Sequence, residues 1–218
     1  MRGGHPLMAL PILAMVALFC GASLSVAETV RDRLWIWGRP AGIYNKTHFR
    51  AMGLRSTVEP VDGAEQMGIV NTIFIATDNL GSLDEYYRPF RRLSRVYWSL
   101  VAAGGGTSQP ARESAFALAE KNENVVGFIL DDFFHEPSIG NAADPGPQGA
   151  MRAALTPEEL RTLRQRPVRG VHLPLMAVIY TGQLKLGARA HLAEVDQICL
   201  WTWRPVDLAH LEANFAAL

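Results

Sequence analysis

The sequence predicts an α/β fold: a (β/α) TIM-type barrel that is apparently incomplete, with six βα units visible. Three observations predict it: short apolar runs rich in β-branched and aromatic residues, helical patterns with clear start signals between them, and polar or aromatic residues where most runs end. Strict alternation of this kind indicates a parallel sheet with right-handed crossovers. Because a complete barrel has eight units and about 250 residues, a truncated barrel, a six-unit variant and an open doubly wound sheet are the alternatives.

The predicted strands are short and apolar throughout, which suits a parallel sheet that is buried on both faces. They cover residues 34–37, 72–76, 96–101, 125–130, 175–180 and 198–203. No glycine-rich fingerprint follows the first strand, and this favours the barrel over a nucleotide-binding sheet.

The predicted helices begin with recognisable capping residues. Ser82 and Glu85 form a capping box, and Thr156 stands before Pro157, which is favoured at the first helical position. Ser108 precedes an alanine-rich stretch. We expect helices at residues 60–68, 82–92, 110–121, from 156 onward, at 186–195 and at 206–217.

Residues 1–27 have the pattern of a secretory signal peptide. Arg2 gives a short positive segment, an apolar run covers residues 7–19, and Ser25 and Ala27 place small residues before a cleavage site. The alternative is an uncleaved membrane anchor, but the run is short for a span of about 20 residues. We therefore expect a secreted or periplasmic protein with one domain, residues 28–218.

The composition gives no support to several functional classes. Removing residues 1–27 takes away one of the 21 basic residues and none of the 21 acidic ones, which leaves a net charge near −1. A nearly neutral chain without basic runs gives no reason to expect nucleic acid as a partner, or a stable membrane association after cleavage. Only one cysteine, Cys199, follows residue 27, so no internal disulfide is expected, and no motif predicts a cofactor.

The fourth predicted strand ends in two carboxylates, Asp131 and Asp132. Side chains alternate along a strand, so Asp131 and Phe133 are expected on one face and Asp132 on the other. A glycine suits the crowded barrel interior, and Gly127 shares its face with Asp131. We therefore place Asp131 at the barrel mouth, where sites of this fold lie, and Asp132 on the flank. Alternatively, Asp131 forms a structural ion pair and Asp132 caps the next segment.

These residues carry a resemblance to known enzymes. The spacing from Gly127 to Asp131 resembles that of several TIM-barrel glycoside hydrolases, in which the carboxylate is a catalytic acid or nucleophile. More broadly, residues 34–38, 127–134 and 201–203 are similar to those of an uncharacterised secreted bacterial family with glycosidase-like barrels. The resemblance implies a saccharide or polysaccharide substrate and a catalytic role for Asp131.

A glycoside hydrolase also needs a second carboxyl group at a defined distance. Because Asp131 and Asp132 are expected on opposite faces, they make a poor pair. Glu136 in the following loop is the nearest other partner, and Asp78, just past the second strand, is another. The predicted catalytic set is Asp131, Asp132 and Glu136.

Aromatic residues form the second group of candidates, because sugar rings stack on indole and phenol rings. Those in or at the ends of strands are Trp37, Tyr97 or Trp98, Tyr180, Trp201 and Trp203, with core packing as the alternative for each. A long polar loop over residues 39–56 is expected to overhang the mouth. The predicted substrate-binding residues are Trp37, Tyr180, Trp201, Trp203 and His48.

Two further loops complete the prediction. Residues 133–155 are longer than a plain connector, which suggests a lid or binding loop. Residues 104–108 are glycine-rich but lack the lysine of a phosphate-binding loop, so they are interpreted as a flexible linker.

Three functional hypotheses follow. The first is a glycoside hydrolase and the second is a non-catalytic carbohydrate-binding barrel. The third is a metal-dependent polysaccharide deacetylase or hydrolase, since Asp131, Asp132, His135 and Glu136 are possible ligands. The His-x-x-x-His pair of the deacetylases is absent from the sequence, so no metal site is predicted.

Overall fold

A computed structural model describes residues 29–46, 48–77, 80–102, 104–135, 152–185, 187–202 and 204–218, and for His48 and Phe49 it describes the backbone alone. The predicted signal peptide, residues 1–27, lies outside this part of the chain. Among the described helices, none combines the length and the apolar character that a membrane span needs.

Six parallel strands form one sheet in the order β1-β2-β3-β4-β7-β8. The strands are β1 (Ile36–Gly38), β2 (Asn71–Phe74), β3 (Arg95–Ser99), β4 (Val125–Leu130), β7 (Leu175–Tyr180) and β8 (Gln197–Trp201). Each lies within two residues of its predicted position, so the predicted α/β class is confirmed. Each strand also pairs with the one before it along the sheet, whereas a doubly wound sheet reverses its order at a switch point.

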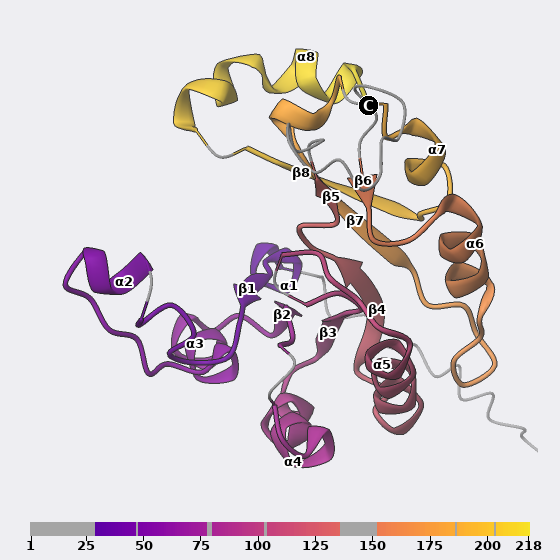
Figure 1. Ribbon diagram of the computed structural model, residues 1–218. Helices are drawn as coiled ribbons and strands as arrows, with labels where there is room; N and C mark the ends of the chain where they lie inside the picture. Colours follow the sequence, from indigo (N-terminus) through magenta and orange to yellow (C-terminus); the bar gives the residue numbers. More distant parts are fainter. Residues whose placement is uncertain are drawn as a thin grey trace, which may run out of the picture.

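The sheet is curled so that its two edge strands approach each other across the concave face (Figure 1). The rings of Trp37 in β1 and Trp201 in β8 meet edge to face, with centroids 4.8 Å apart. The Oη of Tyr97 in β3 donates to the Oε1 of Gln197 in β8 at 2.9 Å. β1 and β8 are not hydrogen-bonded neighbours. The sheet is therefore a half-barrel, and side chains bridge the seam, the line along which β1 faces β8.

A helical segment follows every strand of the sheet, and α3 to α6 lie around its convex side in Figure 1. The helices are α3 (Pro60–Met67), α4 (Leu83–Tyr87), α5 (Gln109–Lys121), α6 (Pro157–Gln165), α7 (Arg189–Leu192) and α8 (Leu211–Ala216). Two short helices, α1 (Val30–Arg33) and α2 (His48–Ala51), flank β1 and were not expected from the sequence.

Three predicted helices are wrong in length. The helix expected at residues 82–92 continues after α4 as the 3₁₀ helix η1 (Arg88–Arg92), because Pro89 has no N–H to extend the α-helical ladder. Gly187, with φ +77°, precedes the short α7 and limits its length. The last helix begins as a second 3₁₀ segment, η3 (Pro205–His210).

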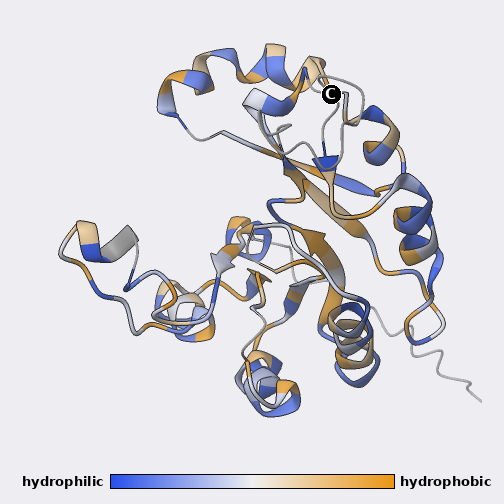
Figure 2. Cartoon of the chain, viewed as in Figure 1, coloured by the Kyte–Doolittle hydropathy of each residue, from blue (hydrophilic) through white to orange (hydrophobic). Residues whose placement is uncertain are grey.

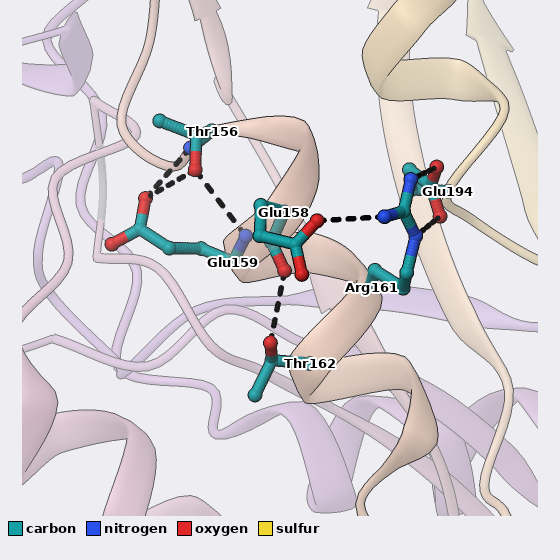
Figure 3. A network of polar contacts seen from close by, with 6 residues as sticks. All are labelled: Thr156, Glu158, Glu159, Arg161, Thr162 and Glu194. Atoms are coloured by element: carbon teal, nitrogen blue, oxygen red, sulfur yellow. Dashed lines mark hydrogen bonds and ion pairs between the residues drawn. The ribbon is translucent and has the colours of Figure 1, made fainter.

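The start of α6 agrees with the capping residues predicted for it. Thr156 Oγ1 accepts from the backbone N–H of Glu159 at 3.2 Å, and Glu159 Oε2 accepts from the backbone N–H of Thr156 at 2.8 Å (Figure 3). Arg161 then donates to Glu158 and to Glu194, both at 2.6 Å. Because Glu194 follows α7, this pair joins the two helices; an exposed ion pair stabilises by about 0–1 kcal/mol.

The main hydrophobic core lies between the convex face and the helices. Trp98 of β3 is 2% exposed, and its ring centroid lies 4.6 Å from that of Phe74 and 5.4 Å from that of Tyr87. Figure 2 shows apolar strands beside helices whose polar residues mark their outer sides. Burying a side chain such as Phe128 stabilises the fold by about 1.5–3 kcal/mol.

The concave face has a smaller apolar core, in which Ile75, Ile129 and Val178 are fully buried. Below them the ring of Tyr97 covers Gly127, and a Cβ at position 127 would lie 2.3 Å from that ring. The crowded interior predicted for Gly127 is therefore confirmed.

The connection after β4 contains a two-stranded antiparallel ribbon, β5 (Phe134–His135) and β6 (Arg152–Ala153). Residues 136–151 lie outside the described part of the chain. The lid or binding loop expected at residues 133–155 therefore stays a prediction.

Candidate functional site

A cavity of about 750 Å³ opens at the C-terminal ends of the strands, between the end of β4 and the loop after β1. Its polar and aromatic walls include Trp37, Arg39, Tyr44, Glu59, Asp131, Asp132, Tyr180 and Trp201. Residues 39–44 and Ser56 line it, so the two ends of the loop that was expected to overhang the mouth lie at the cavity. Ligand pockets are typically about 300–1,000 Å³.

Asp131 lies immediately after β4, on the concave side, as predicted. Its side chain is only 4% exposed, and its Oδ2 accepts from the guanidinium of Arg39 at 2.6 Å. Burial raises the pKa of Asp131 from an ordinary 3.8 to about 6; the negative charge of Asp132 adds to the rise, and Arg39 opposes it. Asp131 is therefore a carboxyl group that stays largely protonated in mildly acidic solution, below about pH 6.

Asp132 lines the same cavity, so the expectation that the two carboxylates point to opposite faces is wrong. The reason is the backbone: β4 ends at Leu130, and Asp132 has φ +50°, a left-handed conformation that breaks the alternation. The same turn sends Phe133, expected beside Asp131, into the core on the convex side, where it is fully buried. Asp132 therefore acts in the same cavity as Asp131.

Two donors hold the Asp132 carboxylate in place. The Oη of Tyr180 makes a short hydrogen bond to Oδ1, and the backbone N–H of Gly104 donates to Oδ2 at 3.3 Å. Burial, first, and the hydrogen bond to Asp132 raise the pKa of Tyr180, so its phenol keeps the proton that it donates. Arg39 also reaches Oδ2, at 3.6 Å.

Arg39 supplies the positive charge of the site, and it was not among the site residues predicted from the sequence. It follows β1 directly, pairs with both aspartates, and stacks over Tyr44 at 5.6 Å from the ring centroid. Its position could have indicated this role, since sites in parallel α/β folds lie at the C-terminal ends of the strands.

The glycine-rich loop after β3 belongs to the site, although it was interpreted as a linker. A Cβ on Gly105 would lie 2.0 Å from the carbonyl oxygen of Asp132, and Gly105 has φ +76°. Both the positive φ and the lack of space for a Cβ therefore require a glycine at position 105. This contact brings the N–H of the preceding Gly104 against the Asp132 carboxylate.

The predicted aromatic residues separate into two groups. Trp37, Tyr180 and Trp201 line the cavity. Tyr97 and Trp98 do not, because Tyr97 bonds to Gln197 below the cavity and Trp98 lies in the convex core. For Tyr97 and Trp98 the core-packing alternative is the correct one.

The carboxylate of Glu59 also lines the cavity, and Glu59 was not among the site residues predicted from the sequence. It lies just before α3, after a loop of about 20 residues that starts at the end of β1. Because Glu59 is far in sequence from any predicted strand end, its place in the cavity could not be predicted from the strand pattern. Gly38 and Pro60 explain its position: a Cβ at Gly38 would lie 2.4 Å from the Cβ of Pro60, so the start of α3 rests on the end of β1.

Several predicted residues lie outside the described part of the chain: Glu136, Trp203, Asp78 and the side chain of His48. Their roles stay predictions. Within the described ranges, no three His, Cys, Asp or Glu side chains are grouped to hold a metal ion.

The chain matches no protein-family model, no curated protein and no solved structure. The site must therefore be interpreted from its own chemistry. It combines a buried carboxyl group of raised pKa, a second carboxylate held by two donors, one arginine, and two indole rings at a cavity of ligand size.

Proposed function

We propose that the protein is a secreted glycoside-hydrolase-like protein that acts on a saccharide in this cavity, with Asp131 as the general acid. The observation that carries the proposal is the buried Asp131 carboxyl, whose pKa of about 6 leaves it protonated in mildly acidic solution. An efficient general acid has a pKa near the working pH, and glycosidic bond cleavage requires protonation of the leaving oxygen.

The rest of the cavity supports a sugar ligand. Trp37 and Trp201 present indole rings that suit the C–H faces of a sugar ring. Asp132, held by Tyr180 and Gly104, lies beside Asp131, and the charge of Asp132 adds to the raised pKa of Asp131. Arg39 holds the carboxyl of Asp131 in one orientation.

The proposal also covers the finer fold and the location. In it, the half-barrel is of the TIM type, residues 1–27 are removed during export, and the chain works as a secreted or periplasmic protein. A strand order that follows the chain, with a cavity at the strand ends, supports the TIM-type relationship.

The test uses the purified chain and a panel of soluble polysaccharides and 4-nitrophenyl glycosides. We expect release of reducing ends from at least one polysaccharide, and a fall in kcat/KM of about 100- to 10,000-fold in Asp131→Asn, because general acid catalysis contributes about this factor. Asp84→Asn is the matched control, since Asp84 is exposed and pairs with Lys121 away from the cavity. An active Asp131→Asn variant would exclude Asp131 as the acid.

A second candidate is saccharide binding without turnover. The observation that favours it is the 2.6 Å contact between Arg39 and Asp131, because a guanidinium this close favours the ionised carboxylate, which has no proton to donate. Calorimetric titration with the same polysaccharides separates the two functions: binding without product, equally strong in Asp131→Asn, supports a binding protein.

A further inference from the structure

Glu59 differs from the two aspartates of the cavity in its surroundings. Asp131 and Asp132 both pair with Arg39, whereas Glu59 takes part in no ion pair with a described residue. It is half-buried and reaches the cavity from the β1–α3 side. The cavity thus has carboxyl groups on two different walls.

The Glu59 carboxylate is held through one oxygen. Its Oε2 accepts from the Oη of Tyr86 at 3.0 Å and from the backbone N–H of Ala41 at 3.4 Å. Among the described residues, none donates to Oε1. Burial, and then the hydrogen bond to Glu59, raise the pKa of Tyr86, so the phenol remains a donor. Such a carboxylate is fixed in position and keeps a lone pair for water.

Helix capping does not explain the position of Glu59. It occupies the N-cap of α3, where Ser, Thr, Asp and Asn are preferred because their short side chains bond to the first turn. The Glu59 side chain makes no capping hydrogen bond and turns to Tyr86 instead. This places the carboxylate where it can act on a ligand in the cavity.

We propose that Glu59 is the general base of the reaction and acts from a different wall of the cavity than Asp131. This rests on the proposed function. A glycoside hydrolase needs two carboxyl groups that flank the scissile bond. Both oxygens of Asp132 already accept hydrogen bonds, from Tyr180 and Gly104, whereas Glu59 is engaged through one oxygen.

The reaction then balances as an inverting hydrolysis. Asp131 gives its proton to the glycosidic oxygen as the bond from that oxygen to the anomeric carbon breaks. The Glu59 carboxylate takes a proton from a water molecule, whose oxygen forms the new bond to the anomeric carbon from the opposite side. The products are a free alcohol and a hemiacetal of inverted configuration, and Asp131 regains its proton from Glu59 through solvent.

The test compares Glu59→Gln with Glu65→Gln, an exposed glutamate of α3 that pairs with Arg92. The substrates are the best polysaccharide of the panel and a 2,4-dinitrophenyl glycoside of the same sugar. We expect Glu59→Gln to lose about 100- to 10,000-fold in kcat/KM on both substrates, because base catalysis is needed for either leaving group. Glu65→Gln should keep the wild-type rate.

Asp131→Asn should behave differently, because a dinitrophenolate leaves without protonation. Its rate on the dinitrophenyl glycoside should fall by less than about tenfold, while its rate on the polysaccharide collapses. Proton NMR of the first product should show inverted anomeric configuration. The calorimetric affinity of Glu59→Gln for the polysaccharide should stay near the wild-type value, which a collapsed cavity would not allow.

The possible failures are distinguishable. If the wild-type chain hydrolyses no glycan, or if Asp131→Asn is fully active, the proposed function is wrong and the role of Glu59 falls with it. If Asp131→Asn is inactive on the polysaccharide but Glu59→Gln keeps its rate, or if the product retains its configuration, only the assignment of Glu59 as general base is overturned.

Discussion

The convex and concave faces of the sheet are built from alternate residues of the same strands, yet they differ in polarity, in the size of their apolar cores and in charge. On the convex face, Phe74, Trp98 and Phe128 lie in an apolar core that the helices cover. On the concave face, three residues are fully buried, and the C-terminal end carries paired carboxylates and an arginine. The difference teaches that alternation can separate stability from chemistry: Leu130, the last residue of β4, lies in the convex core, and Asp131, the next residue, lines the cavity.

The largest expected effect tests the convex face. Trp98→Ala removes a ring that contacts Phe74 and Tyr87, and large-to-small changes of buried tryptophan cost about 3–5 kcal/mol. We expect that loss in the free energy of unfolding, measured by urea titration. Asp131→Asn, compared at pH 5, should cost much less. A small loss in Trp98→Ala would mean that the convex core does not dominate stability.

The next effect is a pH dependence on the concave face. Because the folded state raises the pKa of Asp131 from 3.8 to about 6, this group's contribution to stability is fully present below about pH 4 and is lost as the pH rises through about 6. At about 1.4 kcal/mol per pKa unit, the stability of the wild type relative to Asp131→Asn should fall by about 2–3 kcal/mol between pH 4 and pH 8. Urea titrations of both chains measure it, and a constant difference would contradict the raised pKa.

The smallest effect concerns the crowded layer below the cavity. Gly127→Ala places a Cβ 2.3 Å from the Tyr97 ring, and overpacking of this kind costs about 1–3 kcal/mol. Shortening the neighbour in Tyr97→Ala/Gly127→Ala should recover part of the loss caused by the second substitution. If Gly127→Ala is neutral in the presence of Tyr97, the concave face is looser than its geometry indicates.

The α/β class and the six parallel strands could be predicted from the sequence because their signals are local and repeated. The six apolar runs and the capping residues around Thr156 each depend on a few neighbouring residues. The placement of Asp131 and the reason for Gly127 followed from simple alternation. The predicted helix lengths were wrong at Pro89 and Gly187, where the backbone preferences of proline and glycine outweighed the hydrophobic pattern.

The residues of the candidate site could be predicted only where they lie in a strand or directly after one. Trp37, Tyr180 and Trp201 were found at strand ends. Asp132 was assigned to the wrong face because a left-handed φ leaves no signal in an aspartate. Glu59 comes from a loop whose path depends on the contact between Gly38 and Pro60, which no sequence pattern reveals.

The seam between β1 and β8 has a mechanical consequence. In a closed barrel, widening the mouth would break a ladder of backbone hydrogen bonds between the first and last strands. Here the Trp37–Trp201 ring pair joins β1 to β8, and the Tyr97–Gln197 hydrogen bond joins β3 to β8. Each contributes about 0.5–1.5 kcal/mol. Among the described residues, moving β1 away from β8 would therefore break side-chain contacts but no backbone ladder of the sheet.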